Sequence, residues 1–161
     1  MNPRPAFRRN IRSALKLLML GTGAAILAGC ARDNHGFSPD RQLMQTSREW
    51  SRVTETGNIE AIVAYWTDDA VLMIPGMPTL RGKAAIRNYV EQSLKTPGFK
   101  IRWKPVDAHV SGDMGYLIER SSVTAPDAKG TLNTQEFRVV TIWKMGADGK
   151  WRDVLDSSIP D

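Results

Sequence analysis

The chain has 161 residues, and 22 Lys and Arg residues against 17 Asp and Glu residues give it a formal net charge of +5 at pH 7. The excess comes from five cations in a stretch without acids: Arg4, Arg8, Arg9, Arg12 and Lys16. The rest of the chain balances 17 basic against 17 acidic residues, which argues against a nucleic-acid-binding surface. The single cysteine excludes an intrachain disulfide, so a packed core must stabilise the fold.

An apolar run from Leu17 to Gly29 follows these cations. It is too short to span a bilayer, which takes about 20 residues, but it suits the core of a secretory signal. It ends in Leu27-Ala28-Gly29-Cys30, which resembles the bacterial lipobox. The sequence therefore predicts a signal peptide over residues 1–29 and a lipoprotein anchored to the lipid bilayer through acylated Cys30. By resemblance to lipoprotein sorting, Ala31 favours the periplasmic face of the outer membrane if the host is Gram-negative.

Residues 30–39 form a predicted polar tether, and residues 40–161 a single domain, because no repeat or second linker interrupts them. Ser38-Pro39-Asp40 supplies an N-cap and a proline in the first turn, which predicts a helix from there to about Thr56. Asn58 is expected to cap a second helix, whose apolar stripe comprises Ile59, Ile62, Val63 and Trp66.

Asp68-Asp69 is expected to form the turn after this second helix. A buried strand over residues 70–74 and a third helix over about 83–94 follow, with Tyr89 on the inner side of that helix. The rest of the chain predicts four strands, at about 99–111, 115–124, 133–145 and 150–157. The apolar phase changes by one residue at Pro105, which predicts a β-bulge and a curved sheet.

Several segments of the domain carry a family likeness: Gly57 to Ala70, Pro75 to Arg87, Val140 to Lys144, Gly149 to Trp151 and Asp156 to Ser158. They resemble the nuclear transport factor 2-like superfamily and, within it, the ketosteroid-isomerase-like and SnoaL-like branch. The resemblance implies an α+β, cone-shaped fold in which three N-terminal helices pack in a highly curved, mostly antiparallel sheet. It also implies a homodimer. It leaves function open, because this fold hosts enzymes, binding proteins and assembly modules.

Ketosteroid-isomerase chemistry needs a carboxylate base and acidic hydrogen-bond donors around an oxyanion. The resemblance places the base at Ile74, the tyrosine donor at Trp50, the aspartic acid donor at Val140 and a supporting tyrosine at Val90. None of the four groups is retained, and Ile and Val cannot transfer a proton. Steroid-type isomerisation by these positions is therefore not expected.

The resemblance also assigns pocket-facing positions, which alternate along each strand. It places Arg138 and Asp156 on adjacent strands of one interior, near Tyr116. An arginine beside Asp156 would lower the pKa of that carboxyl and make it a weak base, whereas an apolar corner without arginine would raise it. The predicted pocket comprises Trp50, Ile74, Tyr89, Tyr116, Ile118, Arg120, Arg138, Val140, Val154 and Asp156.

Two functional hypotheses follow from this pocket. The first is an envelope-anchored module that binds a protein or a small apolar or carboxylate-bearing molecule, with Arg138 and Asp156 orienting the ligand or neutralising each other. The second is an isomerase, lyase or cyclase that acts on a small apolar substrate through Asp156, Arg138 and Tyr116. A cavity larger than about 300 Å³ with Asp156 facing it would favour the second hypothesis.

Metal and cofactor sites are not expected. His35 lies in the tether and His109 on the outward phase of its strand, so the two histidines do not form a metal site. The paired serines at 121–122 and 157–158 have no histidine placed by a motif, which leaves a hydrolase triad without support.

Overall fold

The computed structural model describes residues 38–161, so the predicted signal peptide, Cys30 and His35 lie outside the described residues. Helix α1 (Pro39–Thr54) begins as predicted, because the Ser38 side chain accepts a hydrogen bond from the backbone N–H of Arg41. Helix α2 (Ile59–Val63) is capped in the same way by Asn58. Helix α3 spans Lys83–Lys95. None of the helices within residues 38–161 is long and apolar enough to cross a membrane.

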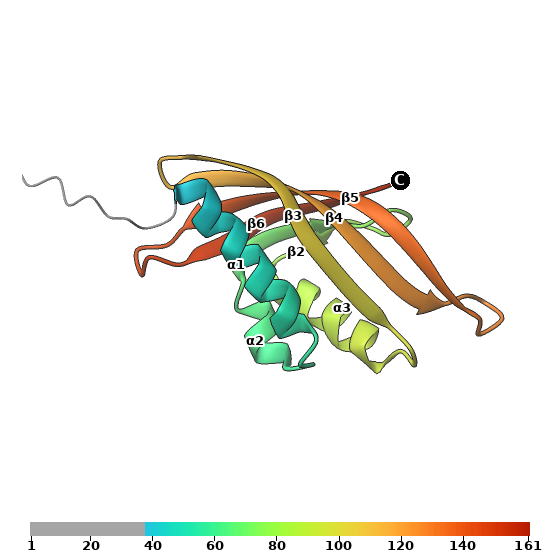
Figure 1. The fold of residues 1–161 in the computed structure, drawn as a ribbon. Helices are drawn as coiled ribbons and strands as arrows, with labels where there is room; N and C mark the ends of the chain where they lie inside the picture. The colour runs from blue at the N-terminus through green and yellow to red at the C-terminus, as the bar shows by residue number, and fades with distance from the viewer. Residues whose placement is uncertain (1–37) are drawn as a thin grey trace, which may run out of the picture. The chain divides into compact units, whose positions relative to one another are not determined.

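Six strands form one mixed sheet in the order β2-β1-β6-β5-β4-β3. Their bounds are β1 Trp66–Met73, β2 Leu80–Arg81, β3 Lys100–Ser111, β4 Met114–Pro126, β5 Leu132–Met145 and β6 Trp151–Pro160. Only the β1–β6 pair is parallel within this described sheet. The sheet arches over α1, α2 and α3, which all lie on its inner side (Figure 1). The predicted α+β architecture of N-terminal helices in a curved, mostly antiparallel sheet is confirmed.

The junction between α2 and β1 differs from the prediction. The helix ends at Val63, and Trp66 already belongs to the first strand, which also contains Asp68 and Asp69. The spacing of Trp66 predicted a helix because a buried tryptophan fits the apolar stripe of a helix as well as the inner face of a strand. Its side chain is 5% exposed. Asp68 is not a turn residue but forms a surface ion pair with Lys83 at 2.9 Å.

Three register shifts interrupt the described sheet, and one of them lies between Trp66 and Val71, where β1 pairs with β6. The predicted bulge at Pro105 is confirmed, because the β3–β4 register shifts between Pro105 and Asp107. The third shift lies between β5 and β6, where Trp143 pairs with Asp153 but the preceding Ile142 pairs with Leu155. Val154 is thus an extra residue, and it moves the following residues of β6 to the opposite phase.

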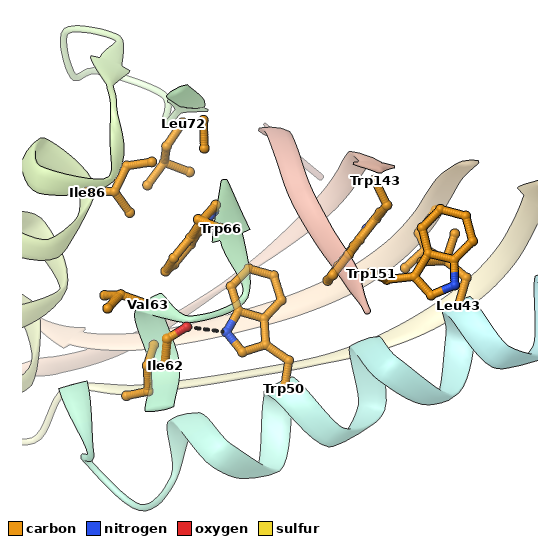
Figure 2. Packing of buried hydrophobic residues seen from close by; sticks show 11 residues of the cluster. Leu43, Trp50, Ile62, Val63, Trp66, Leu72, Ile86, Trp143 and Trp151 are labelled. Atoms are coloured by element: carbon orange, nitrogen blue, oxygen red, sulfur yellow. Dashed lines mark hydrogen bonds between the residues drawn. The ribbon is translucent and has the colours of Figure 1, made fainter. Parts of the chain in front are cut away.

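A cluster of indoles forms the core between α1 and the sheet. Trp50 stacks on Tyr65 with ring centroids 5.5 Å apart and meets the rings of Trp66, Trp103 and Trp143 edge-on at 4.6, 5.0 and 5.5 Å. Figure 2 shows Trp50 pointing from α1 into this cluster, with its indole N–H donating to the carbonyl oxygen of Ile62 at 3.1 Å. The single donor of Trp50 is therefore occupied by the backbone.

The helix can approach the sheet closely because of a glycine. Gly115 is buried in β4, and a Cβ atom there would lie 2.8 Å from Cδ2 of Leu43 on α1. Leu43 is itself fully buried. A larger residue at position 115 would push α1 away from the inner face of the sheet.

Candidate functional site

A cavity of about 770 Å³ lies between the inner face of the sheet and helices α1 and α3. Its walls are mostly apolar and aromatic, including Trp50, Tyr89, Phe99, Trp103 and Phe137. Four acids contribute to its lining: Glu119, Glu136, Asp156 and Asp161. No Lys, Arg or His of residues 38–161 does so. Asp161 is paired with Arg120 and Arg138 from outside the lining, whereas Glu119 and Asp156 lie among apolar walls without a cation in the described lining.

Glu119 enters this interior from β4, where it pairs with Val139 of β5. The residue is only 2% exposed. Its Oε1 accepts a hydrogen bond from the Ser47 hydroxyl of α1, and its Oε2 accepts one from the Thr141 hydroxyl of β5 at 3.4 Å. Burial raises the pKa of Glu119 to about 7, although both hydroxyls act in the opposite direction.

Two indoles hold the hydroxyls that contact Glu119. The Trp103 indole N–H donates to Ser47 Oγ at 3.1 Å, and the Trp143 indole N–H donates to Thr141 Oγ1 at 2.7 Å. Trp143 and Thr141 are fully buried. Two hydroxyl arms thus hold the Glu119 carboxyl: Ser47 with Trp103, and Thr141 with Trp143. They come from different elements of the fold.

Asp156 faces the same cavity from β6, where it pairs with Thr141. Its Oδ1 is buried and has no hydrogen-bond partner among residues 38–161. Burial and then the negative charge of Glu119 raise the pKa of Asp156 to about 7. Both carboxyls of the cavity can therefore gain or lose a proton near neutral pH.

Asp153 is a third buried acid on β6, outside the lining of the cavity. The β6 bulge explains its position, because strict alternation would place two residues three apart on opposite faces, whereas Asp153 and Asp156 both point inward. Neither carboxyl oxygen of Asp153 has a hydrogen-bond partner among the residues that the structure describes. Burial and the charges of Asp156 and Glu119 raise the pKa of Asp153 well above its usual range.

The structure brings together some of the predicted pocket residues: Trp50, Ile74, Tyr89 and Asp156 line the cavity. The others do not line it: Tyr116, Ile118, Arg120, Arg138, Val140 and Val154. Tyr116 and Ile118 are 40% and 39% exposed, whereas Leu117 and Glu119 between and beside them are buried. The predicted phase of β4 and β5 was thus wrong by one residue, which reverses the face of every side chain.

The predicted contact between Arg138 and Asp156 is also wrong. Arg138 lies on the outer side of the sheet, and its Nε is 2.9 Å from Oδ1 of Asp161. Arg120 pairs with the same carboxylate. No arginine of residues 38–161 pairs with Asp156, and burial and the charge of Glu119 raise the pKa of this carboxyl.

Sequence reasoning missed Glu119 and the two hydroxyls that bind it. The inward residues of β4 are Gly115, Leu117, Glu119 and Ser121, a set that is less apolar than the outward Tyr116 and Ile118. The family resemblance assigned the other face of this strand to the pocket, and the hydropathy of the strand did not contradict it. The available signal was an acid in phase with Leu117, which is unusual for a buried strand position.

The positions of the isomerase groups remain without acids in the structure. Ile74 and Val90 line the cavity, and Val139, rather than the predicted Val140, faces it from β5. Trp50 lines it too, but its N–H is bonded to the Ile62 carbonyl oxygen and is not free to stabilise an oxyanion. Among residues 38–161, no three His, Cys, Asp or Glu side chains are grouped to hold a metal ion.

Comparison with known proteins gives matches to one family and to many solved structures. The SnoaL-like domain model matches residues 47–154. A ketosteroid isomerase-like protein from Erwinia carotovora atroseptica is 22% identical, with 78% of this chain and 100% of that chain covered and a TM-score of 0.64. An NTF2-like protein with a cystatin-like fold from Novosphingobium aromaticivorans is 20% identical, with 75% and 81% covered and a TM-score of 0.62.

A third solved structure has a similar fold. The CaMKII hub of S. rosetta is 15% identical, with 78% of this chain and 99% of that chain covered and a TM-score of 0.64. Likeness at these identities shows the fold alone. Comparison with curated proteins finds no match.

Proposed function

The chain belongs to the SnoaL-like domain family, and we propose that it is an acid–base enzyme. The fold of this family serves several functions, so the chemistry of the cavity must decide among them. This cavity takes a small, largely apolar molecule, and Glu119 and Asp156 move a proton to and from that molecule. The observation that carries this proposal is a pair of buried carboxyls, each with its pKa raised to about 7, in the lining of one cavity.

A group transfers protons best when its pKa lies near the working pH. Apolar surroundings that raise the pKa of a carboxyl are typical of acid–base sites. Glu119 and Asp156 meet this condition without the acids expected at Ile74 and Val140. The proposal therefore keeps the reaction class of an isomerase, lyase or cyclase and the role of Asp156, and it assigns the second role to Glu119 rather than to Arg138 or Tyr116.

The size of the cavity supports an organic substrate. Its volume of about 770 Å³ lies within the usual range for small-molecule sites, about 300 to 1,000 Å³. Tyr89, Trp103 and Phe137 provide flat apolar walls. Such walls suit the ring or chain of a small apolar molecule, while the two carboxyls lie where its polar group would react.

Proton exchange at a ketone tests this function directly. The full chain in detergent is incubated with acetylnaphthalene in D₂O, and loss of the methyl proton signal is followed by NMR. One carboxylate removes a methyl proton while the other carboxyl protonates the carbonyl oxygen, and reversal of the step from deuterated carboxyls returns a deuteron to carbon. We expect faster exchange with the protein than with buffer, and loss of that acceleration in Asp156→Asn and in Glu119→Gln.

The alternative function is a binding module without catalysis, which the aromatic walls of the cavity also support. Quenching of tryptophan fluorescence by acetylnaphthalene measures binding separately from exchange. Wild-type protein that binds the ketone without accelerating exchange would contradict the enzyme and establish the binding module. Arg138→Gln is the matched control, because Arg138 lies on the other face and should leave both measurements unchanged.

Envelope anchoring and self-association complete the proposal. We propose that acylated Cys30 holds the domain in the bilayer, and the lipobox-like residues 27–30 support this. We also propose a homodimer, which the exposed Tyr116 and Ile118 on the outer face of the sheet support. Cys30→Ser should release the protein from membranes, and sedimentation of the detergent-solubilised chain should give a dimer. Membrane retention of the variant or a monomer would contradict the respective part.

A further inference from the structure

The two carboxyls of the cavity are bound differently, and this difference divides their roles. We infer that Glu119 is the ionised, proton-accepting member and Asp156 the protonated, proton-donating member, so that the site selects an uncharged ligand with an acceptor oxygen. The inference rests on the proposed acid–base function, but it concerns where the proton resides before any reaction.

The direction of each hydrogen bond to Glu119 follows from the indoles. An indole N–H can only donate, so Trp103 occupies a lone pair of Ser47 and leaves the hydroxyl hydrogen to point at Glu119. Trp143 likewise donates to the Thr141 hydroxyl oxygen, which leaves the Thr141 hydrogen to point at the other oxygen of Glu119. Both carboxyl oxygens therefore receive a donor, which is the arrangement that favours an ionised carboxylate.

The surroundings of Asp156 favour its protonated form, in contrast to those of Glu119. Its Oδ1 is buried without a partner in the described part of the chain, so an ionised Asp156 would lack compensation. The titratable groups that face it are all acids or phenols: Glu119 from β4, Asp153 from β6 and Tyr89 from α3. Burial raises the pKa of the Tyr89 hydroxyl, which keeps it neutral.

Two carboxyls that repel each other retain a proton between them until the pH is well above the usual range. That proton resides on the carboxyl whose neutral form loses the least hydrogen bonding. Protonating Glu119 would turn one of its acceptor oxygens into a donor and disturb a hydroxyl arm. Protonating Asp156 disturbs no hydrogen bond to Oδ1. The proton therefore lies on Asp156.

This assignment defines the chemical class of ligand. The protonated carboxyl of Asp156 offers a donor to a carbonyl, ether or hydroxyl oxygen, while the carboxylate of Glu119 accepts a proton from the ligand. A carboxylate-bearing ligand would be repelled by Glu119, and no Lys, Arg or His among the described lining residues would offset that charge. The site therefore discriminates against anions of the same size and shape.

Carboxyl-carbon NMR of the full chain, labelled with carbon-13 at Asp and Glu, tests the division. Asp156→Asn and Glu119→Gln assign the two signals. We expect that, as the pH rises, Glu119 loses its proton first and Asp156 second. Asp156 losing its proton before Glu119 would overturn the inference. Because this readout needs no substrate, it is decided separately from the exchange assay: the division stands or fails whether or not the protein accelerates exchange.

Thr141 and Ser47 are positioning residues in this scheme, and their variants provide an independent check. Thr141→Val keeps the side-chain shape and removes one donor, so the protonation constant of Glu119 should rise about tenfold, as expected for a hydrogen bond to a charged group. Ser47→Ala should act in the same direction. The matched control is Thr134→Val on the same strand, whose hydroxyl bonds that of Thr124 at the surface. An unchanged titration of Glu119 in both inner variants would overturn the role of the two arms.

A matched ligand set tests the predicted class. Acetylnaphthalene, naphthylmethanol and naphthoate share one ring system and differ in charge and polarity. At neutral pH we expect the ketone and the alcohol to bind at least about tenfold more tightly than the carboxylate, and Glu119→Gln to reduce that preference. Binding of naphthoate as tight as that of the ketone would contradict the inference about ligand class.

Discussion

Arg120 and Arg138, on the outer face of the sheet, both pair with Asp161, a partly exposed residue that also contributes to the lining of the cavity. On the inner face, Glu119 and Asp156 line a cavity to which no Lys, Arg or His in the described range contributes. The Asp161 carboxylate is paired with two arginines, whereas burial raises the pKa of both Glu119 and Asp156 to about 7. Glu119 and Arg120 are neighbours on β4, and strand alternation places one in the apolar interior and the other in contact with water.

Neutralising one inner carboxyl should have the largest effect on activity. Asp156→Asn and Glu119→Gln should each reduce ketone exchange by at least about 100-fold, the usual contribution of a general acid or base. Arg138→Gln should leave the rate unchanged. Equal rates in the wild type and the two inner variants would show that the inner carboxyls transfer no proton.

The stability of the fold should depend on pH through the inner carboxyls. The pKa of Glu119 is raised in the folded state, so its contribution to stability is fully present below the unfolded pKa, near 4, and is lost as the pH rises to about 7. This loss is on the order of 3 kcal/mol for Glu119, and Asp153 and Asp156 add to it with the same sign. Exposed acids whose pKa is lowered, such as Asp68 and Asp148, lose their contribution only at lower pH.

Urea unfolding at about pH 5 and about pH 8 measures this dependence. We expect a larger free energy of unfolding at the acidic pH, and a weaker pH dependence in Glu119→Gln. A protein that becomes more stable between these two pH values would contradict the account of the inner face.

Asp153 is buried but does not line the cavity, so its replacement tests the cost of burying an acid separately from catalysis. Asp153→Asn removes an ionisable group that has no hydrogen-bond partner among the described residues, so the free energy of unfolding at about pH 8 should rise by about 1 to 3 kcal/mol. The ketone exchange rate should change far less than in Asp156→Asn, because Asp153 does not line the cavity. Denaturant titrations and the exchange assay on one preparation check both outcomes, and a loss of stability would show that Asp153 has a stabilising partner.

The outer face should give the smallest effect. Arg138→Gln removes an ion pair with Asp161 in which the arginine side chain is 55% exposed. Pairs of this kind contribute about 0 to 1 kcal/mol, so thermal unfolding should barely change. A large destabilisation would mean that the outer pair is a structural centre and would remove the contrast between the two faces.

Sequence reasoning predicted the fold well because local signals and the family likeness agree. Ser38 and Asn58 cap their helices as expected, and the phase change at Pro105 marks a real bulge. The candidate site was harder to predict, because it depends on the phase of two strands. An error of one residue exchanged Glu119 for Ile118 and Arg120, and the only local signal against it was an acid in phase with Leu117.

The β6 bulge could not be predicted from periodicity. It inserts Val154 between Asp153 and Asp156, and it is visible only in the β5–β6 register. The hydroxyl arms on Glu119 were equally hidden, because Ser47 and Thr141 approach it from separate elements. The role of a small polar side chain on an inner face cannot be predicted until the acid that it contacts is known.

Glu119 and Asp156 share an apolar cavity that raises the pKa of both carboxyls, with Glu119 the first to ionise. Carbon-13 NMR titration of the two carboxyl carbons in the full chain measures this property directly. We expect both carboxyls to lose their protons well above pH 4, Glu119 first and Asp156 second. Midpoints near 4, the value of carboxyls in water, would contradict it.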